Sequence, residues 1–105
     1  MSYILVFMTA SSKSEAKKIV RSLLEEKLIA CANMIDSVSS VFWWQENIKE
    51  EKEVLVIMKS HQELFNKVST RIREVHSYDT PEILALSIVD GSSHYLEWMN
   101  KVLNR

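Results

Sequence analysis

The run Tyr3-Ile4-Leu5-Val6-Phe7-Met8-Thr9 sets the fold class of this chain, because the rest of the sequence repeats the unit that it begins. It is rich in β-branched and aromatic residues and too short for a helix, so it predicts a strand buried on both faces. Ser12 and Glu15 then form a capping-box pattern, and apolar residues recur at helical spacing. A helix from about Ser12 to Lys27 is predicted to follow the strand.

The middle of the chain predicts a long β-hairpin. Residues 29–45 have no helix cap and mix apolar with polar side chains, which is typical of a long, bent strand. The polar residues 45–50 suit an exposed connection, and the apolar run 54–58 predicts the returning strand. Trp43 and Trp44 are neighbours on the first of these strands, so they point to opposite faces and at least one of them needs cover from another subunit.

The second half repeats the first. Ser60 and Glu63 form another capping box, which predicts a helix ending near His76. Pro81 stops helical structure, residues 83–89 predict a fourth strand, and the apolar spacing of residues 95–103 predicts a last helix. The order β-α-β-β-α-β-α indicates an α+β, ferredoxin-like βαββαβ sandwich with an antiparallel sheet and an additional C-terminal helix.

Composition excludes several classes of function. The 105 residues fit a single domain, 1–105. Thirteen basic and fourteen acidic side chains give a net charge of -1, so the chain has no positive electrostatic field that would attract the phosphates of nucleic acid. No apolar run approaches the ~18 residues of a membrane span. Without a signal-peptide pattern, and with Cys31 as the single cysteine, a cytoplasmic location is expected.

Five segments together resemble the CutA divalent-cation-tolerance family: Leu28-Ile29-Ala30-Cys31-Ala32-Asn33, Val41-Phe42-Trp43-Trp44, Glu50-Glu51-Lys52-Glu53-Val54, His76-Ser77-Tyr78-Asp79-Thr80-Pro81-Glu82-Ile83 and Tyr95-Leu96-Glu97-Trp98. The resemblance covers essentially the whole chain. It implies a ferredoxin-like protomer in a homotrimer, a link to copper and other divalent cations, and no established catalysis. The chain departs from the family pattern at Asp36-Ser37, usually Pro-Gly, and at Ser77, usually Pro.

Cys31, His76 and Glu82 are the candidate metal ligands. Thiolate and imidazole together suit copper or zinc. Glu82 could supply an oxygen ligand, and it also lies in one of the segments that carry the resemblance. A lone cysteine is often a small buried hydrophobe, and His76 at a helix end is equally well explained as a capping residue. Met8 is expected to pack in the core, and His61 and His94 at predicted helix starts are expected to be solvated.

The sequence does not predict an enzyme, since no triad, carboxylate pair in an evident cleft or cofactor fingerprint is present. Two hypotheses remain. The first is a homotrimeric protein that binds a divalent cation, copper above all, and confers tolerance. The alternative is a trimeric regulatory or scaffolding module, similar to PII signalling proteins, that binds a small ligand at its subunit clefts.

Overall fold

The structure of the protein, a computed structural model that describes residues 2–105, contains a 4-stranded antiparallel sheet in the order β2-β3-β1-β4. The elements in chain order are β1 (Tyr3–Ala10), α1 (Lys13–Glu25), β2 (Cys31–Trp44), β3 (Asn47–His61), the 3-10 helix η1 (Gln62–Leu64), α2 (Phe65–Val75), β4 (Ile83–Ser87) and α3 (Ser93–Val102). The ferredoxin-like fold class and the additional C-terminal helix are therefore confirmed.

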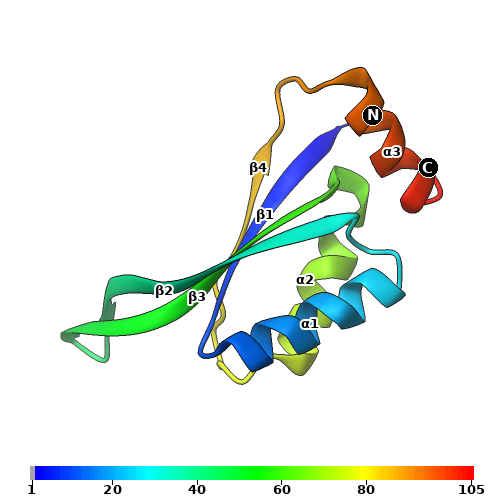
Figure 1. The fold of residues 1–105 in the computed structure, drawn as a ribbon. Coiled ribbons are helices and arrows are strands. Elements are labelled where there is room, and N and C mark those ends of the chain that lie inside the picture. The colour runs from blue at the N-terminus through cyan, green and yellow to red at the C-terminus, as the bar shows by residue number, and fades with distance from the viewer. Residues whose placement is uncertain (1) are drawn as a thin grey trace.

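Helices α1 and α2 lie side by side against one face of the sheet, and α3 lies beside the start of β1 (Figure 1). Alternation along β1 places Val6 and Met8 between the sheet and the helices, where both are fully buried. Leu23 of α1 and Ile72 of α2 complete this core. Met8 is thus a core residue, as predicted. Within residues 2–105, no helix has the length and apolar character needed to cross a membrane.

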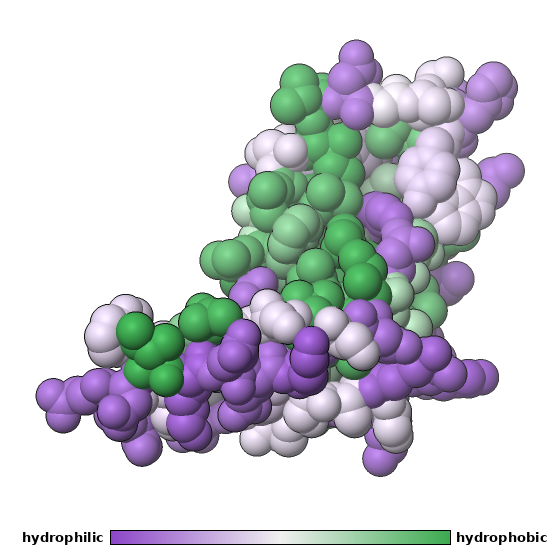
Figure 2. All heavy atoms as spheres, turned by 60° about the vertical axis from the view of Figure 1, so that its left-hand side comes forward, coloured by the Kyte–Doolittle hydropathy of each residue, from purple (hydrophilic) through white to green (hydrophobic). Residues whose placement is uncertain are grey.

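Neither α1 nor α2 lies over the opposite face of the sheet, and α3 contacts this face at the end where Tyr3 and Cys31 lie. Leu5 and Phe7 of β1 pair with Leu86 and Leu84 of β4, so all four side chains share this open face. Leu84 is 57% exposed and Leu86 is 45% exposed. Figure 2 shows apolar side chains forming a band over this side of the molecule, and more of them near the hairpin tip. Residues 2–105 therefore leave this side of β4 without a second layer of cover.

The hairpin connection is much shorter than residues 45–50. β2 and β3 pair as far as Trp44 and Asn47, so the turn consists of Gln45 and Glu46. Their φ values are 50° and 66°, the positive pair that a type I′ turn requires. The prediction of a loop over residues 45–50 was wrong because this arm projects from the body. Its strands are exposed to solvent, so polar residues occur in them as readily as in a loop.

The predicted bend in β2 is present at the unusual Asp36-Ser37 pair. The register of β2 against β3 shifts between Ile35 and Val38, and Ser37 has a φ of 58°. A bulge adds residues to one strand and increases its twist. It turns the outer half of the hairpin away from the sheet.

The second capping box does not form. Ser60 is still in β3, and its hydroxyl donates a buried hydrogen bond of 2.7 Å to the carbonyl of Leu28. The α-helix begins only at Phe65, after η1, and no side chain caps it. His61 is also not solvated: it is fully buried, stacks on Tyr3, and neither ring nitrogen has a hydrogen-bond partner within residues 2–105. His94 is exposed, as predicted.

Ser60→Ala is expected to lower the free energy of unfolding by about 1–3 kcal/mol, because the buried Leu28 carbonyl loses this donor. Urea denaturation followed by circular dichroism measures the difference. Ser14→Ala, on the exposed side of α1, is the matched control and should change stability by less than about 0.5 kcal/mol. Equal stability of the two variants would contradict the structural role of Ser60.

Candidate functional site

A pocket of about 620 Å³ lies where the hairpin leaves the body of the protein. We call it the hairpin pocket. Three segments form it: the end of β1, the outer parts of β2 and β3, and the loop before β4. Its lining residues are Thr9, Ser40, Val41, Phe42, Trp43, Trp44, Lys49, Glu51, Glu53, Tyr78, Asp79, Thr80 and Glu82. Of the three predicted ligands, Glu82 is therefore the one that lines this pocket.

Tyr78 and Glu53 form a hydrogen-bonded pair in the pocket wall. The Tyr78 hydroxyl donates to Oε2 of Glu53 at 2.7 Å, and Glu53 is only 8% exposed. Burial raises the pKa of Tyr78, and the hydrogen bond and negative charge of Glu53 raise it further. The phenol therefore stays protonated and acts as a donor. Sequence reasoning missed Glu53, because nothing separates it from the other acidic residues of the 50–53 run.

His76 follows α2 as its C-terminal cap, and both of its ring nitrogens are engaged. Nε2 lies 2.8 Å from the carbonyl oxygen of Thr9, and Nδ1 lies 3.0 Å from the backbone nitrogen of Tyr78. A carbonyl can only accept and an amide N–H can only donate, so Nε2 carries the proton and Nδ1 accepts. In this arrangement the ring ties β1 to the loop after α2 and has no free lone pair for a metal ion.

Glu15 fixes the same loop from the side of α1. Its carboxylate accepts hydrogen bonds from the Ser11 hydroxyl at 2.9 Å and from the Ser77 backbone N–H at 2.7 Å. Burial alone raises the pKa of Glu15, but the hydrogen bonds from Ser77 and Ser11 outweigh it and lower the pKa to about 2. The bond from the Glu15 N–H to the Ser12 hydroxyl confirms Ser12 as the N-cap, but the Glu15 carboxylate accepts from the N–H of Ser11, so the predicted capping box forms only in part. The sequence gives no signal of the contact with Ser77.

Cys31 lies at the other end of the sheet. It pairs with Lys59, which lies opposite Leu5, whereas His76 contacts Thr9. The rise along β1 from Leu5 to Thr9 alone is about 13 Å. Cys31 is also on the edge strand β2, whereas Glu82 directly precedes β4, the strand at the opposite edge. A single protomer therefore does not bring the three predicted ligands together.

The surroundings of Cys31 come from β3 and α3. The thiol is partly exposed on the open face, with Nζ of Lys59 at 3.6 Å and the hydroxyl of Tyr95 at 3.7 Å from its sulfur atom. Burial raises the pKa of Tyr95, and its hydrogen bond to Cys31 adds to the effect. Within residues 2–105, no group of 3 or more His, Cys, Asp and Glu side chains is arranged to hold a metal ion.

The comparisons with known proteins agree with the fold. Residues 4–102 match the family described as "CutA1 divalent ion tolerance protein". The chain is 38% identical over 96 residues to the divalent-cation tolerance protein CutA of Pyrococcus horikoshii, covering 91% of this chain and 93% of that one. It is 35% identical to Protein CutA 1, chloroplastic, of Oryza sativa, but spans only 54% of that protein's length.

The solved structures include "Structure of the Periplasmic divalent cation tolerance protein CutA from Archaeoglobus fulgidus". It superposes with a TM-score of 0.94 at 36% identity and covers 96% of this chain and 98% of that one. The structure of CutA1 from Oryza sativa also gives a TM-score of 0.94, at 33% identity, over 97% of this chain and 94% of that one. The match thus extends over nearly every element of the fold. The family description names divalent ion tolerance and no catalytic activity, which agrees with the prediction that the chain is not an enzyme. The chain belongs to the CutA1 divalent ion tolerance protein family.

Proposed function

We propose that the protein is a non-catalytic, cytoplasmic homotrimer that binds a divalent cation, copper in particular, and thereby contributes to metal tolerance. The observation that carries this proposal is the partly exposed thiol of Cys31 on the open face of the sheet, in a chain of the divalent ion tolerance family. Thiolates favour copper and zinc over hard cations. The related proteins named above carry the words chloroplastic and periplasmic, so cytoplasm rests on the sequence pattern of this chain alone.

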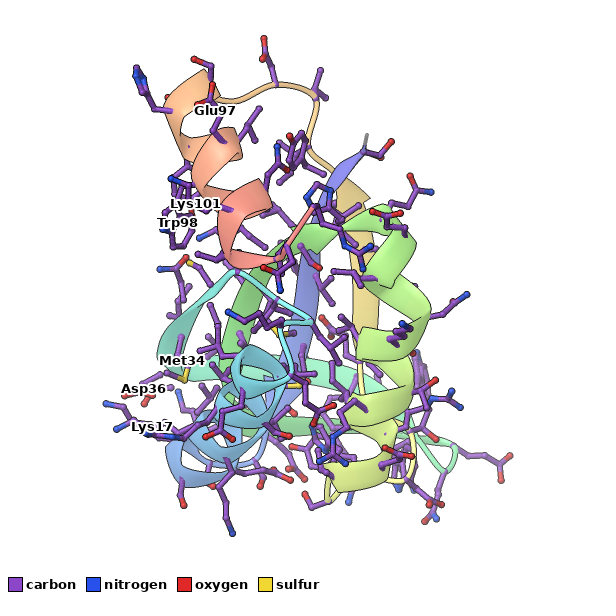
Figure 3. The ribbon with its side chains drawn as sticks, turned by 90° about the vertical axis from the view of Figure 1, so that its right-hand side faces the viewer. Lys17, Met34, Asp36, Glu97, Trp98 and Lys101 are labelled. Carbon is purple, nitrogen blue, oxygen red and sulfur yellow. The ribbon has the colours of Figure 1, made fainter. Side chains whose placement is uncertain are left out.

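The homotrimer is supported by what the protomer leaves uncovered. Leu84 and Leu86 are exposed on the open face, and β2 and β4 are both edge strands. Unpaired edges and apolar faces favour association with another chain. Figure 3 shows the β2 edge between α1 and α3, with Lys17, Met34, Asp36 and Trp98 directed away from the body. A heterologous contact between two different edges closes into a ring when its rotation permits.

Assembly would also allow the separated candidate ligands to contribute to one site. Cys31, His76 and Glu82 stay our candidates, but as residues contributed by different protomers. Contact of the β2 edge of one protomer with the β4 edge of the next would remove the separation of Cys31 and Glu82 across the sheet. The two edges would also have to be displaced along the strands, because Cys31 lies at the level of Leu5 and Glu82 lies beyond the level of Met8. His76 would join the site only by releasing the N–H of Tyr78 from Nδ1.

The proposal is tested by calorimetric titration of Cu(II) into the assembled wild-type protein and into Cys31→Ser, His76→Gln and Glu82→Gln. Cys31→Ser is expected to weaken copper binding at least about tenfold, because a hydroxyl is a poor ligand for this metal. Glu82→Gln is expected to have a smaller effect. Glu25→Gln, an exposed carboxylate on α1, is the control and should match wild type. Equal affinity in wild type and Cys31→Ser would exclude this site.

The alternative function is a trimeric, PII-like regulatory or scaffolding module that binds a small ligand at its subunit clefts. The hairpin pocket favours it, because a volume of 620 Å³ falls within the range of about 300–1,000 Å³ typical of small-molecule sites. If small-ligand binding survives in Cys31→Ser while copper binding is lost, the two functions belong to separate sites.

A further inference from the structure

We propose that α3 is a cover over one end of the open face that acid releases, with the imidazole of His61 as the sensor. This inference goes beyond the proposed metal binding, because it concerns a conformational change rather than a ligand. It depends on burial inside one protomer, which assembly can only increase. Three features lead to it: what covers His61, what its ring lacks, and how α3 is held.

The side chain of His61 lies under α3. His61 pairs with Tyr3 at the start of β1, and the centroids of the two rings are 4.8 Å apart. Alternation from Ser60, which bonds on the helix side of the sheet, puts His61 on the face away from α1 and α2. At this end α3 contacts the open face, since Asn100 accepts from the Tyr3 hydroxyl at 3.2 Å. His61 is fully buried there, so α3 supplies its cover.

The ring of His61 lacks hydrogen-bond partners. Its two nitrogens are buried without one, and no other side-chain nitrogen or oxygen within residues 2–105 is in this position. A buried polar group without a partner already costs free energy. A proton on the ring increases this cost, because imidazolium has two N–H donors and a charge. The charged ring therefore favours a position of α3 that admits water.

The charged groups around His61 do not compensate an imidazolium. Lys59 on the same face is itself a cation, and its ammonium group lies 3.6 Å from the sulfur of Cys31. Glu63 of η1 pairs with Arg105 at 3.7 Å. The other titratable groups that β1, the loop after β4 and α3 contribute are exposed or bonded to another residue: Tyr3, Asp90, His94, Tyr95, Glu97 and Lys101.

The contacts that hold α3 come from side chains. Within residues 2–105, no backbone hydrogen bond joins α3 to the sheet. Met99 and Leu103 supply its buried apolar surface, and the Tyr95 hydroxyl lies 3.7 Å from the Cys31 sulfur. An element attached in this way can separate while the rest of the fold stays intact. Release of α3 would expose Met99 and Leu103 and move Tyr95 away from Cys31.

The sign of the pH effect follows from the two states. Histidine in water takes up a proton near pH 6.5. The released state can bind this proton, and the closed state opposes it. Closing is therefore undisturbed well above about pH 6.5, and it weakens by up to about tenfold for each pH unit below that value.

Hydrogen exchange followed by mass spectrometry tests the proposal on the assembled wild-type protein. Exchange is measured at pH 7 and pH 5 and corrected for the intrinsic pH dependence of amide exchange. The protection of the α3 amides should fall about twentyfold at pH 5 relative to that of the α1 amides. Glu15 keeps its charge at this pH, because its pKa is about 2, so α1 is a valid reference. Equal relative protection at both pH values would overturn the proposal.

Two variants identify the sensor. His61→Phe fills the site without a polar group, and His61→Gln keeps a polar group that does not titrate. Both should lose the pH dependence of α3 protection. His94→Gln, which removes an exposed imidazole from α3 itself, is the matched control and should keep it. Wild-type pH dependence in both His61 variants, or its loss in His94→Gln, would overturn the assignment. Circular dichroism and light scattering verify fold and assembly at each pH.

The copper experiment has an independent outcome. Cys31→Ser should lose copper binding and keep the pH response of α3, because its thiol does not contribute a partner to the His61 ring. Acid release of α3 in a protein that does not bind copper would remove only the metal proposal. Copper binding without acid release would remove only this one.

Discussion

Leu86→Asp is expected to convert the proposed trimer to a monomer. Leu86 lies on the open face of the sheet, in the row that contains Leu5, and is 45% exposed. In an assembled trimer this face would be covered, so the new carboxylate would be buried without a partner. Such a burial costs several kcal/mol, and a cost of about 4 kcal/mol weakens an interface about a thousandfold.

Light scattering at micromolar protein measures the mass directly. The matched control is Leu24→Asp on the outer side of α1, because Leu24 is 41% exposed but faces away from the open sheet. It should leave the trimer intact. In wild type, the melting temperature should rise with protein concentration, since assembly stabilises the folded chain by mass action. A wild-type protein with the mass of one chain would contradict the proposed assembly.

Glu15→Gln is expected to remove a component of stability that depends on pH. The Glu15 carboxyl has an ordinary pKa of 4.5, which falls to about 2 in the folded protein. Its contribution is therefore present above pH 4.5 and is lost as the pH falls toward 2. The lowered pKa corresponds to a contribution on the order of 3 kcal/mol at neutral pH. Glutamine keeps the shape of the side chain but has no charge to titrate.

Urea denaturation between pH 7 and pH 2 measures this effect. The difference in unfolding free energy between wild type and Glu15→Gln should be largest at neutral pH and should shrink as the pH falls. Glu25→Gln, which is exposed on the same helix, should show little difference at any pH. A constant difference between wild type and Glu15→Gln over the whole pH range would show that the Glu15 charge does not stabilise the fold.

The order of elements could be predicted from the sequence because it depends on short-range patterns. Alternation and apolar runs indicated the strands, and helical spacing indicated α1, α2 and α3. These patterns also predicted the core position of Met8 and the bend in β2. They failed for residues 45–50, where an arm exposed to solvent has no buried face, and for Ser60 and His61, where two polar side chains lie in the buried end of a strand.

The candidate site was predicted only in part. Glu82 lies in the hairpin pocket, but Cys31 is at the far end of the sheet. The sequence indicated both crossover helices, although the second begins later than predicted, and it did not show which strand ends the candidate ligands would reach. The strand order β2-β3-β1-β4 decides this separation, since it puts the Cys31 strand and the strand after Glu82 on opposite edges.

The sequence by itself determined the fold class and the family. The tertiary structure decided the chemistry of individual polar groups. Glu15 reaches Ser77 across 62 positions of the chain, and His76 reaches Thr9 across 67. Hydrogen bonds act over about 3 Å in space, whatever the distance along the chain, so only the folded protein shows which side chains are already engaged and which are free to bind a ligand.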